Sequence, residues 1–493
     1  MAITQKIKAG EIVYEQPLGL FIDNKFVPSI DGKTFETINP HTEEPICKVY
    51  EASAEDVDLA VAAARRAKEG CWKDYASSER GKLLIDLANL FDENLEILAS
   101  IESLDNGKSL QLSKADIQQA AGCLRYYGGW ADKVHGQVIE TSSESLDYTR
   151  VEPVGVCGQI IPWNFPILMW SWKVAPAIAT GNCVVIKSSE LTPLSALYAA
   201  TLVVKAGFPP GVINVVSGFG SPTGSALTTH MDVDKVAFTG STVVGRKILE
   251  AAAHSNLKKV TLELGGKSPN IVFDDAELES AATWVNFGIY FNQGQCCCAG
   301  SRILVQEGIY DKFLELFKQK AAANKVGDPF EKGTFQGPQI NKTQFEKILK
   351  YIEQGKQAGA VCEVGGNRIG TKGYYIGPTI FTNVAEDMSI VKEEIFGPVC
   401  VVQKFKTDEE AIELANGTRY GLAGAVHTTS LNRAIRVSNA LKAGTIWINS
   451  YNQLSYQMPF GGFKESGLGR ELGQHALENY TQTKSVRINL SGK

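Results

Sequence analysis

The sequence lacks the features that mark several large classes of protein. No segment approaches the roughly 18 consecutive apolar residues that a membrane-spanning helix needs, and the most apolar stretch, residues 194–204, includes Ser195 and Thr201. An excess of positive charge is also missing, because the formal net charge is -5. A chain with this charge has no electrostatic reason to bind nucleic acid or an anionic membrane surface. We therefore expect neither among its partners.

The cysteines and histidines form none of the usual ligand or disulfide patterns. The ten cysteines contain no Cys-x-x-Cys pair, three of them are consecutive at 296–298, and the six histidines lack zinc-ligand spacing. We expect no metal site, and we expect free thiols in a reducing compartment. Residues 1–16 carry acids and lack the apolar core of a signal peptide. The cytoplasm is therefore the expected location.

The sequence does contain an alternation of strand-like and helix-like segments. Residues 57–113 repeat apolar side chains three and four positions apart, which predicts helices. From residue 154 onward, short β-branched runs alternate with helical stretches. This pattern predicts a mostly parallel sheet with ligand sites at the carboxyl ends of its strands. The predicted strands are residues 154–161, 182–189, 211–218, 233–240 and 258–264.

A second alternation predicts a second α/β unit. Its predicted strands are residues 270–275, 301–306, 361–366, 398–405, 423–428 and 444–450, and its predicted helices are 310–324, 344–359 and 408–417. Two further segments, 145–153 and 483–490, alternate apolar and polar residues outside both units, which predicts exposed edge strands. Because an open edge pairs readily with another chain, we expect an oligomer.

The densest chemical signal is FNQGQCCCAGSR, residues 291–302. Gly294 and Gly300 bracket the three cysteines, so that the backbone can turn tightly and hold a thiolate in a cleft. Cysteine is also a common small buried hydrophobic residue, and a cysteine on its own favours that alternative. The neighbouring segments decide between the two.

Two polar residues at predicted strand ends are candidate partners of a thiol. Glu263 lies in a strand that runs into a Gly-Gly turn, and burial in a parallel sheet would raise the pKa of its carboxyl toward that of a general base. The alternative is a surface glutamate on an edge strand. Asn164 lies between Trp163 and Phe165, with a proline on either side, where its amide suits an oxyanion. The alternative is an asparagine that serves a turn.

Two more strand ends suit a nucleotide. One strand stops at Thr239 and a helix begins after Gly240 and Ser241, where free backbone amides favour a phosphate. GSTVVG is not the GxGxxG fingerprint, so this pattern is weak by itself. Lys187 and Glu190 follow another strand, and a carboxylate there can accept hydrogen bonds from a ribose and repel a 2′-phosphate. The alternative is a surface ion pair.

Taken together, these segments resemble the aldehyde dehydrogenase superfamily, and most of all its class 1/2 branch. The similarity extends from about residue 15 to the C-terminus. The segments that carry it are PWNFP (162–166), KSSE (187–190), FTGST (238–242), LELGGKSP (262–269), FNQGQCCCAGSR (291–302), EEIFGPV (393–399) and PFGGFKESGLGRELG (459–473).

The resemblance implies an architecture and a set of site residues. It implies a Rossmann-like NAD-binding domain (1–132 and 154–265), an α/β catalytic domain (266–475) and a small β oligomerisation extension (133–153 and 476–493). It implies Cys297 as nucleophile, Glu263 as base, Asn164 as oxyanion donor, and Lys173 as a residue that helps to ionise the thiol. The implied NAD-binding residues are Trp163, Lys187, Glu190, Gly240, Ser241, Gly245, Gly265, Glu394 and Phe396. The implied substrate funnel consists of Phe165, Met169, Trp172, Leu454 and Phe460.

The implied reaction is the oxidation of an aldehyde to a carboxylic acid with NAD. It runs through a thiohemiacetal and a thioester on Cys297, and water activated by Glu263 hydrolyses the thioester. The implied partners are a small-molecule aldehyde and other copies of the chain, in a homotetramer or alternatively a dimer. Three alternatives stay open: a CoA-acylating relative with less need of Glu263, a cysteine hydrolase without a nucleotide, and a non-catalytic structural protein on the same fold.

Overall fold

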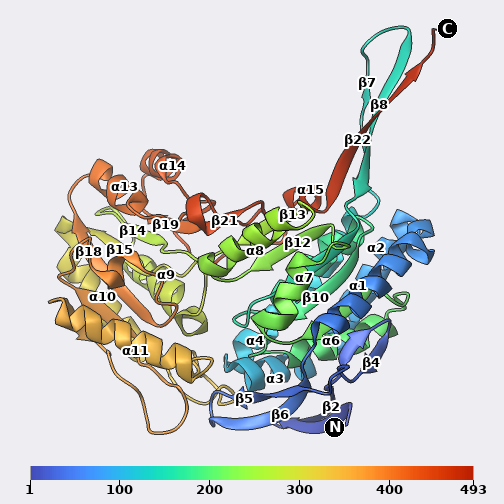
Figure 1. Ribbon diagram of the computed structural model, residues 1–493. Helices are drawn as coiled ribbons and strands as arrows, with labels where there is room; N and C mark the ends of the chain where they lie inside the picture. Colours follow the sequence, from blue (N-terminus) through green and yellow to red (C-terminus); the bar gives the residue numbers. More distant parts are fainter. Residues whose placement is uncertain (1, 492–493) are drawn as a thin grey trace.

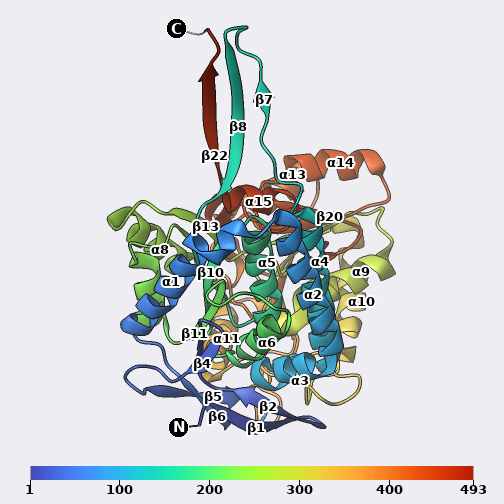
Figure 2. The same cartoon turned by 90° about the vertical axis from the view of Figure 1, so that its right-hand side faces the viewer.

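The chain forms two α/β units and a long β-ribbon that projects away from them (Figure 1). The computed structural model describes residues 2–491. Figure 2 shows the ribbon standing clear of the helices, with the C-terminal strand along one side of it. Within residues 2–491, no helix is long and apolar enough to cross a membrane, and no three His, Cys, Asp or Glu residues are placed to hold a metal ion.

The first unit is built on an eight-stranded sheet whose five central strands are parallel, as the alternation of segments predicts. In sequence order these strands are β9 (Val156–Ile160), β10 (Cys183–Ser188), β11 (Ile213–Ser217), β12 (Lys235–Thr239) and β13 (Lys259–Glu263). The short antiparallel strands β3 (Leu20–Ile22) and β4 (Lys25–Val27) complete one edge of the sheet, and β21 (Gly467–Leu468) completes the other. β10 is buried along its whole length, because helices cover both faces.

The helices of the first unit include the predicted ones. They are α1 (Ala54–Glu69), α2 (Ser77–Glu93), α3 (Leu95–Asn106), α4 (Leu110–Trp130), α5 (Pro166–Ala179), α6 (Leu194–Lys205), α7 (Ser225–Thr229) and α8 (Thr242–His254). Local sequence sets where α1 starts, since the Ser53 hydroxyl accepts from the Asp56 backbone N–H and the Asp56 carboxylate accepts from the Ser53 N–H. Three antiparallel pairs precede α1 and have no counterpart in the predicted elements: β3 with β4, β1 (Thr4–Ala9) with β2 (Ile12–Pro17), and β5 (Thr34–Asn39) with β6 (Glu44–Tyr50).

The second unit is a seven-stranded sheet in the order β16-β17-β18-β15-β14-β19-β20. Its strands are β14 (Pro269–Val272), β15 (Arg302–Gln306), β16 (Val361–Val364), β17 (Thr379–Thr382), β18 (Val399–Phe405), β19 (Ala423–His427) and β20 (Thr445–Ile448). Its helices are α9 (Leu278–Tyr290), α10 (Tyr310–Ala323), α11 (Lys342–Gln357), α12 (Ser389–Lys392), α13 (Asp408–Asn416) and α14 (Leu431–Ala440). The six predicted strands are confirmed, whereas β17, α9, α12 and α14 lie outside the predicted elements.

The ribbon consists of β8 (Ser145–Pro153), β22 (Thr481–Asn489) and the short β7 (Val138–Ile139). β8 and β22 pair antiparallel along their full length, from Pro153 opposite Thr481 to Ser145 opposite Asn489. Both segments are strands, as predicted, but the expectation that 145–153 is an edge strand is wrong, because β8 lies between β22 and β7. The partner strand is more than 300 positions away in the sequence, so the local pattern gives no sign of it. The helix α15 (His475–Asn479) joins the ribbon to the body of the protein.

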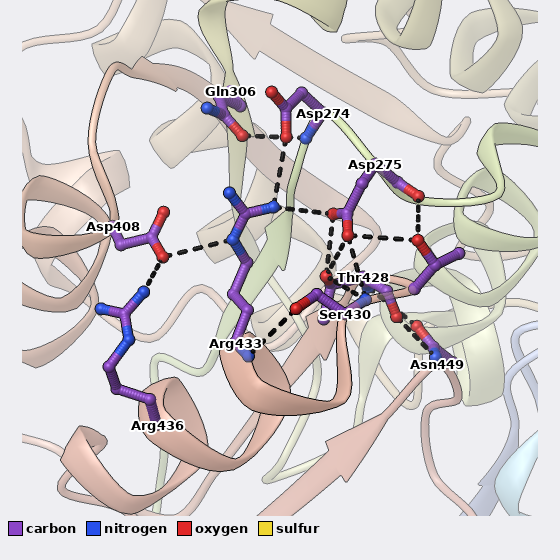
Figure 3. Close-up of polar contacts among 10 residues, drawn as sticks. Asp274, Asp275, Gln306, Asp408, Thr428, Ser430, Arg433, Arg436 and Asn449 are labelled. Carbon is purple, nitrogen blue, oxygen red and sulfur yellow. Dashed lines mark hydrogen bonds and ion pairs between the residues drawn. The ribbon is translucent and has the colours of Figure 1, made fainter.

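A network of polar side chains joins α14 to the loop that follows β20 (Figure 3). The Asp275 carboxylate accepts hydrogen bonds from the Thr428 hydroxyl at 2.8 Å, the Ser430 backbone N–H at 3.0 Å and the Arg433 guanidinium at 2.9 Å. The Asn449 side chain exchanges two hydrogen bonds of 2.9 Å with the Thr428 backbone. The network therefore fixes the start of residues 449–460, a segment that lines the cavity described below.

Replacing Asp275 with alanine should lower the stability of the protein, because the Arg433 guanidinium and the Thr428 hydroxyl lose their shared acceptor. We expect a loss of about 1–3 kcal/mol, measured as a shift of the urea unfolding midpoint. Glu409→Ala is the matched control, since that side chain is 80% exposed and forms only a 3.6 Å pair with Arg436. An equal shift in the two variants would contradict the role assigned to Asp275.

Candidate active site

Two cavities lie side by side at the carboxyl ends of the first sheet. The first, here called the thiol cavity, has a volume of about 200 Å³ and contains the three consecutive cysteines in its wall. The second, the strand-end cavity, has a volume of about 540 Å³ and lies over the ends of β9, β10 and β12. Thr239, the last residue of β12, lines both cavities. The structure thus brings most of the predicted site residues to two adjoining spaces.

The loop that carries the cysteines is fixed by its backbone conformation. Asn292, Gln293 and Gly294 all have left-handed φ values, of 49°, 58° and 71°, and a Cβ on Gly294 would collide with the Gly397 carbonyl. The Gln295 side chain accepts from the Ile340 backbone N–H at 3.0 Å, which anchors the loop just before the cysteines.

The cysteine loop is also anchored just after the cysteines, and this determines which thiol is accessible. The Tyr451 hydroxyl donates to the Cys298 carbonyl at 2.8 Å. Cys296 and Cys298 are buried, at 6% and 1% exposure, whereas Cys297 is part-exposed in the thiol cavity. Of the three consecutive thiols, only that of Cys297 is therefore accessible from the cavity.

The three thiols are coupled electrostatically. The sulfurs of Cys296 and Cys298 are 3.5 Å apart. Hydrogen bonding to Cys296 and Cys298, together with burial and the charge of Glu263, raises the pKa of the Cys297 thiol. Hydrogen bonds from its two neighbours lower the pKa of Cys296. In the free protein Cys297 therefore holds its proton, and a base must take that proton before the sulfur can react.

Asn164 reaches the cysteine loop from the first unit. Its side-chain amide donates to the Gln295 carbonyl at 3.0 Å, and the Asn292 amide donates to the Asn164 carbonyl at 3.0 Å. Asn164 is buried and lines the thiol cavity. An amide has two N–H bonds, so one remains for a ligand beside Cys297. The prolines on either side and these two hydrogen bonds hold that donor in place.

Glu263 ends β13 inside the thiol cavity. Its side chain is only 3% exposed, and among residues 2–491 neither carboxyl oxygen has a hydrogen-bond partner. Burial, followed by the charge of Glu471, raises the pKa of Glu263 to about 8, although the Cys297 thiol and Lys173 act in the opposite direction. A carboxyl group with this pKa can take up and release a proton near neutral pH.

Lys173 and Glu471 form a buried pair behind the cavity wall. The Lys173 ammonium donates to the Thr239 hydroxyl at 2.7 Å and forms a close ion pair with Glu471. Lys173 is not among the residues that line the thiol cavity, so the structure does not bring it there with Cys297. Glu471 lies within the segment 459–473, but the sequence motif by itself assigned it no role.

The rest of the thiol cavity is mostly apolar. All five predicted funnel residues line it: Phe165, Met169, Trp172, Leu454 and Phe460. Sequence reasoning missed further lining residues, namely Ala115, Asp116, Gln119, Leu168, Phe287, Phe291, Asn452 and Leu472. Most of them belong to α4, to α9 or to the residues 449–460 anchored by Asn449, where an ordinary helix or loop pattern gives no functional signal.

The strand-end cavity holds four of the predicted cofactor residues. Trp163, Lys187, Glu190 and Gly240 line it. The Lys187 ammonium lies 3.8 Å from the Glu190 carboxylate, and burial lowers the pKa of Lys187 to about 8. Other lining residues, which lie outside the quoted motifs, include Gly224, Ser225, Thr228 and Lys247.

Ser241 and Gly245 lie beside this cavity and do not line it. The Ser241 hydroxyl caps α8 by accepting from the Val244 N–H, and a Cβ on Gly245 would crowd Leu264. Gly245 therefore lets the first turn of α8 pack close to the end of β13. This packing places the free backbone N–H groups of the α8 N-terminus near the strand ends, where they suit a phosphate group.

Gly265, Glu394 and Phe396 meet at the junction of the two units. The Glu394 carboxylate accepts from the Gly266 N–H at 3.1 Å, and a Cβ on Gly265 would collide with that carboxylate. The Phe396 ring contacts the Trp163 ring, with 5.3 Å between centroids. Burial raises the pKa of Glu394 to about 7. These residues form a wall from Trp163 toward the cysteine loop, where a small cavity separates Glu394 from Cys296.

The strand-end cavity fits a dinucleotide by its chemistry. It lies at the carboxyl ends of parallel strands, the N-terminus of α8 is beside it, and the Glu190 carboxylate follows β10. Beside it, the thiol cavity combines a part-exposed cysteine, an unpaired buried carboxyl and an amide donor. The fold and site are thus those of an α/β protein in which a cavity suited to a dinucleotide adjoins one that contains an accessible thiol.

Comparison with known proteins gives the family. The aldehyde dehydrogenase family profile matches residues 26–486. An aldehyde dehydrogenase of Aspergillus niger is 66% identical over 97% of this chain and 96% of its own. The human mitochondrial aldehyde dehydrogenase is 54% identical over 96% of this chain and 92% of its own. An NAD⁺ complex of a Bacillus cereus aldehyde dehydrogenase has a TM-score of 0.95 at 52% identity, with 96% of both chains covered.

The chain belongs to the aldehyde dehydrogenase family. It is an NAD-dependent enzyme that oxidises aldehydes, as the resemblance of its motifs implied.

Limited alkylation should distinguish the three consecutive cysteines. Because Cys297 is part-exposed and its neighbours are buried, we expect iodoacetamide to modify Cys297 well before Cys296 or Cys298. Peptide mass spectrometry at short times measures the order. Cys71 and Cys362 are also accessible, so a C71S/C362S variant leaves Cys297 as the one cysteine that is not buried. First labelling at Cys296 or Cys298 would show that the presented thiol is misassigned.

Proposed function

We propose that the enzyme oxidises an aldehyde to a carboxylic acid through a thioester on Cys297. The observation that supports this most is the convergence of three groups in one cavity: the Cys297 thiol, the unpaired Glu263 carboxyl and the Asn164 amide. The three come from different parts of the chain. A thiol, a base and an oxyanion donor are the groups that acyl chemistry on a sulfur requires.

The first step is addition of the Cys297 sulfur to the aldehyde carbonyl. The part-exposed Cys297 thiol first gives its proton to solvent, and Glu263 is kept for the hydrolysis step. Lys173 aids this ionisation by its charge and without contact, since it lies behind Thr239. The remaining Asn164 N–H and the Cys297 backbone N–H stabilise the alkoxide, each by about 3 kcal/mol.

The strand-end cavity and its surroundings hold NAD in this proposal. Lys187 and Glu190 take the adenosine ribose, and Trp163 forms the wall beside it. The N-terminal turn of α8, with Gly240, Ser241 and Gly245, takes the pyrophosphate. Glu394, supported by Gly265 and Phe396, takes the nicotinamide ribose. When bound, NAD supplies a hydride acceptor for the carbon attached to Cys297.

Hydrolysis of the thioester completes the cycle. Glu263 removes a proton from a water molecule, which attacks the acyl carbon, and the Cys297 sulfur leaves as the acid forms. The Asn164 amide again stabilises the oxyanion. The apolar residues Phe165, Met169, Trp172, Leu454 and Phe460 hold the organic part of the aldehyde and exclude bulk water. The presence of Glu263 favours hydrolysis over transfer of the acyl group to CoA.

We also propose a homotetramer in the cytoplasm, with a dimer as the alternative. The ribbon supports an oligomer, because β8 and β22 stand away from the body of the protein and carry the exposed apolar side chains of Leu146 and Ile488. The division proposed for the chain assigns 1–132 and 154–265 to NAD binding, 266–475 to catalysis and 133–153 with 476–493 to assembly. Gly492 and Lys493 lie outside the described residues.

Glu263→Gln separates acylation from hydrolysis. The amide keeps the shape of the side chain but cannot accept a proton, so the thioester should form once and persist. We expect an initial burst of NADH close to one equivalent per active site, followed by steady turnover at least about a hundredfold below wild type. Stopped-flow absorbance at the NADH band measures both phases.

Two controls accompany this variant. Cys297→Ser should abolish both the burst and the turnover, and added CoA should not restore turnover in Glu263→Gln. Unimpaired turnover of Glu263→Gln would contradict the assignment of the base. Turnover that depends on CoA in the wild-type enzyme would favour the CoA-acylating alternative.

The pH profile should reveal the raised pKa of Glu263. The carboxyl is a base only when ionised, and its pKa is about 8. Under conditions where hydrolysis limits turnover, the steady rate should therefore rise as pH increases through about 8 and level off above it. In Glu263→Asn the residual rate should lack this inflection. A wild-type rate that is flat from pH 6 to about 9 would exclude Glu263 as the limiting base.

A further inference from the structure

Cys298 is held at two points, and both contacts come from the segment that follows β20. The Tyr451 hydroxyl donates to the Cys298 carbonyl at 2.8 Å, and the Cys298 thiol donates to the side-chain oxygen of Asn452 at 3.2 Å. Tyr451 and Cys298 are both buried. Two consecutive residues of one segment therefore fix both the backbone and the sulfur of the same cysteine.

The position of Tyr451 is closely determined by its surroundings. Its ring lies against Gly288 of α9 and against Gly300, where a Cβ would be 2.8 Å and 3.0 Å from ring atoms, respectively. The ring also packs against Trp447, with 4.8 Å between centroids. The Trp447 indole N–H donates to the Gln453 carbonyl at 3.0 Å, which closes the turn that carries Tyr451. The Tyr451 hydroxyl is therefore a fixed donor.

The conformation of Asn452 suits it to hold the thiol. Its φ is 53°, in the left-handed region that asparagine adopts more readily than most residues. Within the described part of the chain, its side-chain nitrogen has no hydrogen-bond partner. The bond from the Cys298 thiol therefore orients the Asn452 side chain, and the Asn452 side chain in turn fixes the sulfur.

This fixation matters because Cys298 borders the same cavity as Cys297. All three consecutive cysteines line the thiol cavity, and their thiols are chemically alike. Neighbouring Cα atoms are only about 3.8 Å apart, so a small shift of the loop would exchange one sulfur for another at the cavity surface. Such a shift would also move the Cys297 sulfur away from the Asn164 amide.

We propose that Tyr451 and Asn452 are positioning residues, which hold Cys298 in place and thereby keep the Cys297 sulfur beside the Asn164 amide. This inference rests on the proposed function of the same cavity. Neither residue takes part in the bonds that form and break. Tyr451 acts through the Cys298 carbonyl, and Asn452 acts through the Cys298 thiol.

Tyr451→Phe tests the first contact, because it keeps the ring and removes the hydroxyl donor. In the C71S/C362S background, the ratio of iodoacetamide labelling at Cys298 to labelling at Cys297 should rise at least about tenfold. The rate of the first NADH turnover, measured by stopped flow, should fall at least about tenfold, because acylation depends on the placement of the sulfur. The dissociation constant of NAD should equal that of wild type, since the strand-end cavity is unaltered.

Asn452→Gly tests the second contact. Glycine adopts a φ of 53° without strain, so the backbone is kept while the acceptor is lost. The labelling ratio should rise and the first turnover should slow, as in Tyr451→Phe. Asn452→Asp retains an oxygen that accepts from the thiol, so its labelling ratio should stay within about threefold of wild type.

Two matched controls make the same exchanges elsewhere in the chain. Tyr198→Phe removes a hydroxyl that donates to the Asn94 side chain at 3.0 Å, in the first unit. Asn383→Gly replaces an asparagine whose φ is 52° and whose side chain donates to the Gly359 carbonyl at 3.2 Å. Both variants should keep the labelling ratio and the first-turnover rate of wild type.

The two contacts can be judged separately, so the proposal is still tested if one variant fails to fold. An unchanged labelling ratio in folded Tyr451→Phe or folded Asn452→Gly would overturn the role of the residue replaced. A slower first turnover without a change in the ratio would also overturn it, because the effect would not then pass through Cys298. Failure of the wild type to reduce NAD with any aldehyde would instead overturn the proposed function, whereas the labelling ratio needs no turnover.

Discussion

The site depends on one contact between the two α/β units, the hydrogen bond from the Asn164 amide to the Gln295 carbonyl. Asn164 follows a strand of the first sheet, and Gln295 precedes the cysteines of the second unit. Asn292 adds a return bond to the Asn164 carbonyl. Since each sheet packs around its own helices, these bonds fix how the Asn164 amide and the Cys297 thiol lie relative to each other. A misplacement of about 1 Å at such a junction lowers the rate of reaction strongly.

The same junction explains why an unpaired acid is tolerated. Glu263 lacks hydrogen-bond partners in the described part of the chain, and a buried polar group of this kind is normally destabilising. Protonation reduces that cost, because a neutral carboxyl is easier to bury than a carboxylate. The cost of burying an unpartnered carboxyl is therefore borne at the position where the proposed mechanism needs a carboxyl that gains and loses a proton. Elsewhere the buried acids have partners, as Asp116 has Lys108 and Glu471 has Lys173.

The sequence predicted the parallel strands of both sheets, because their apolar runs are bounded by glycines and polar turns. It missed β17, which has only four residues and follows Gly377 and Pro378, so that no period is visible. The expectation of an edge strand at 145–153 failed for a different reason, since pairing with β22 is a long-range property.

The site residues also divide into those that the sequence indicates and those that only the structure reveals. Cys297, Glu263 and Asn164 lie in short motifs of unusual composition, and those motifs led to them. Asp116 lies in an ordinary amphipathic helix, and its buried ion pair with Lys108 is visible only in the structure. Lys173 was assigned from the family resemblance alone, and only the structure reveals that it pairs with Glu471. Local sequence therefore indicated the groups that are proposed to react, whereas their electrostatic partners depend on tertiary packing.

Thr239 is the partition between the two cavities, and this has a consequence for how the enzyme can change. Its side chain borders the space on either side, and its hydroxyl is held by Lys173. A larger side chain there would therefore narrow both cavities at once. Affinity for the organic substrate and affinity for the nucleotide are therefore coupled at this position, and neither can be tuned through Thr239 independently of the other.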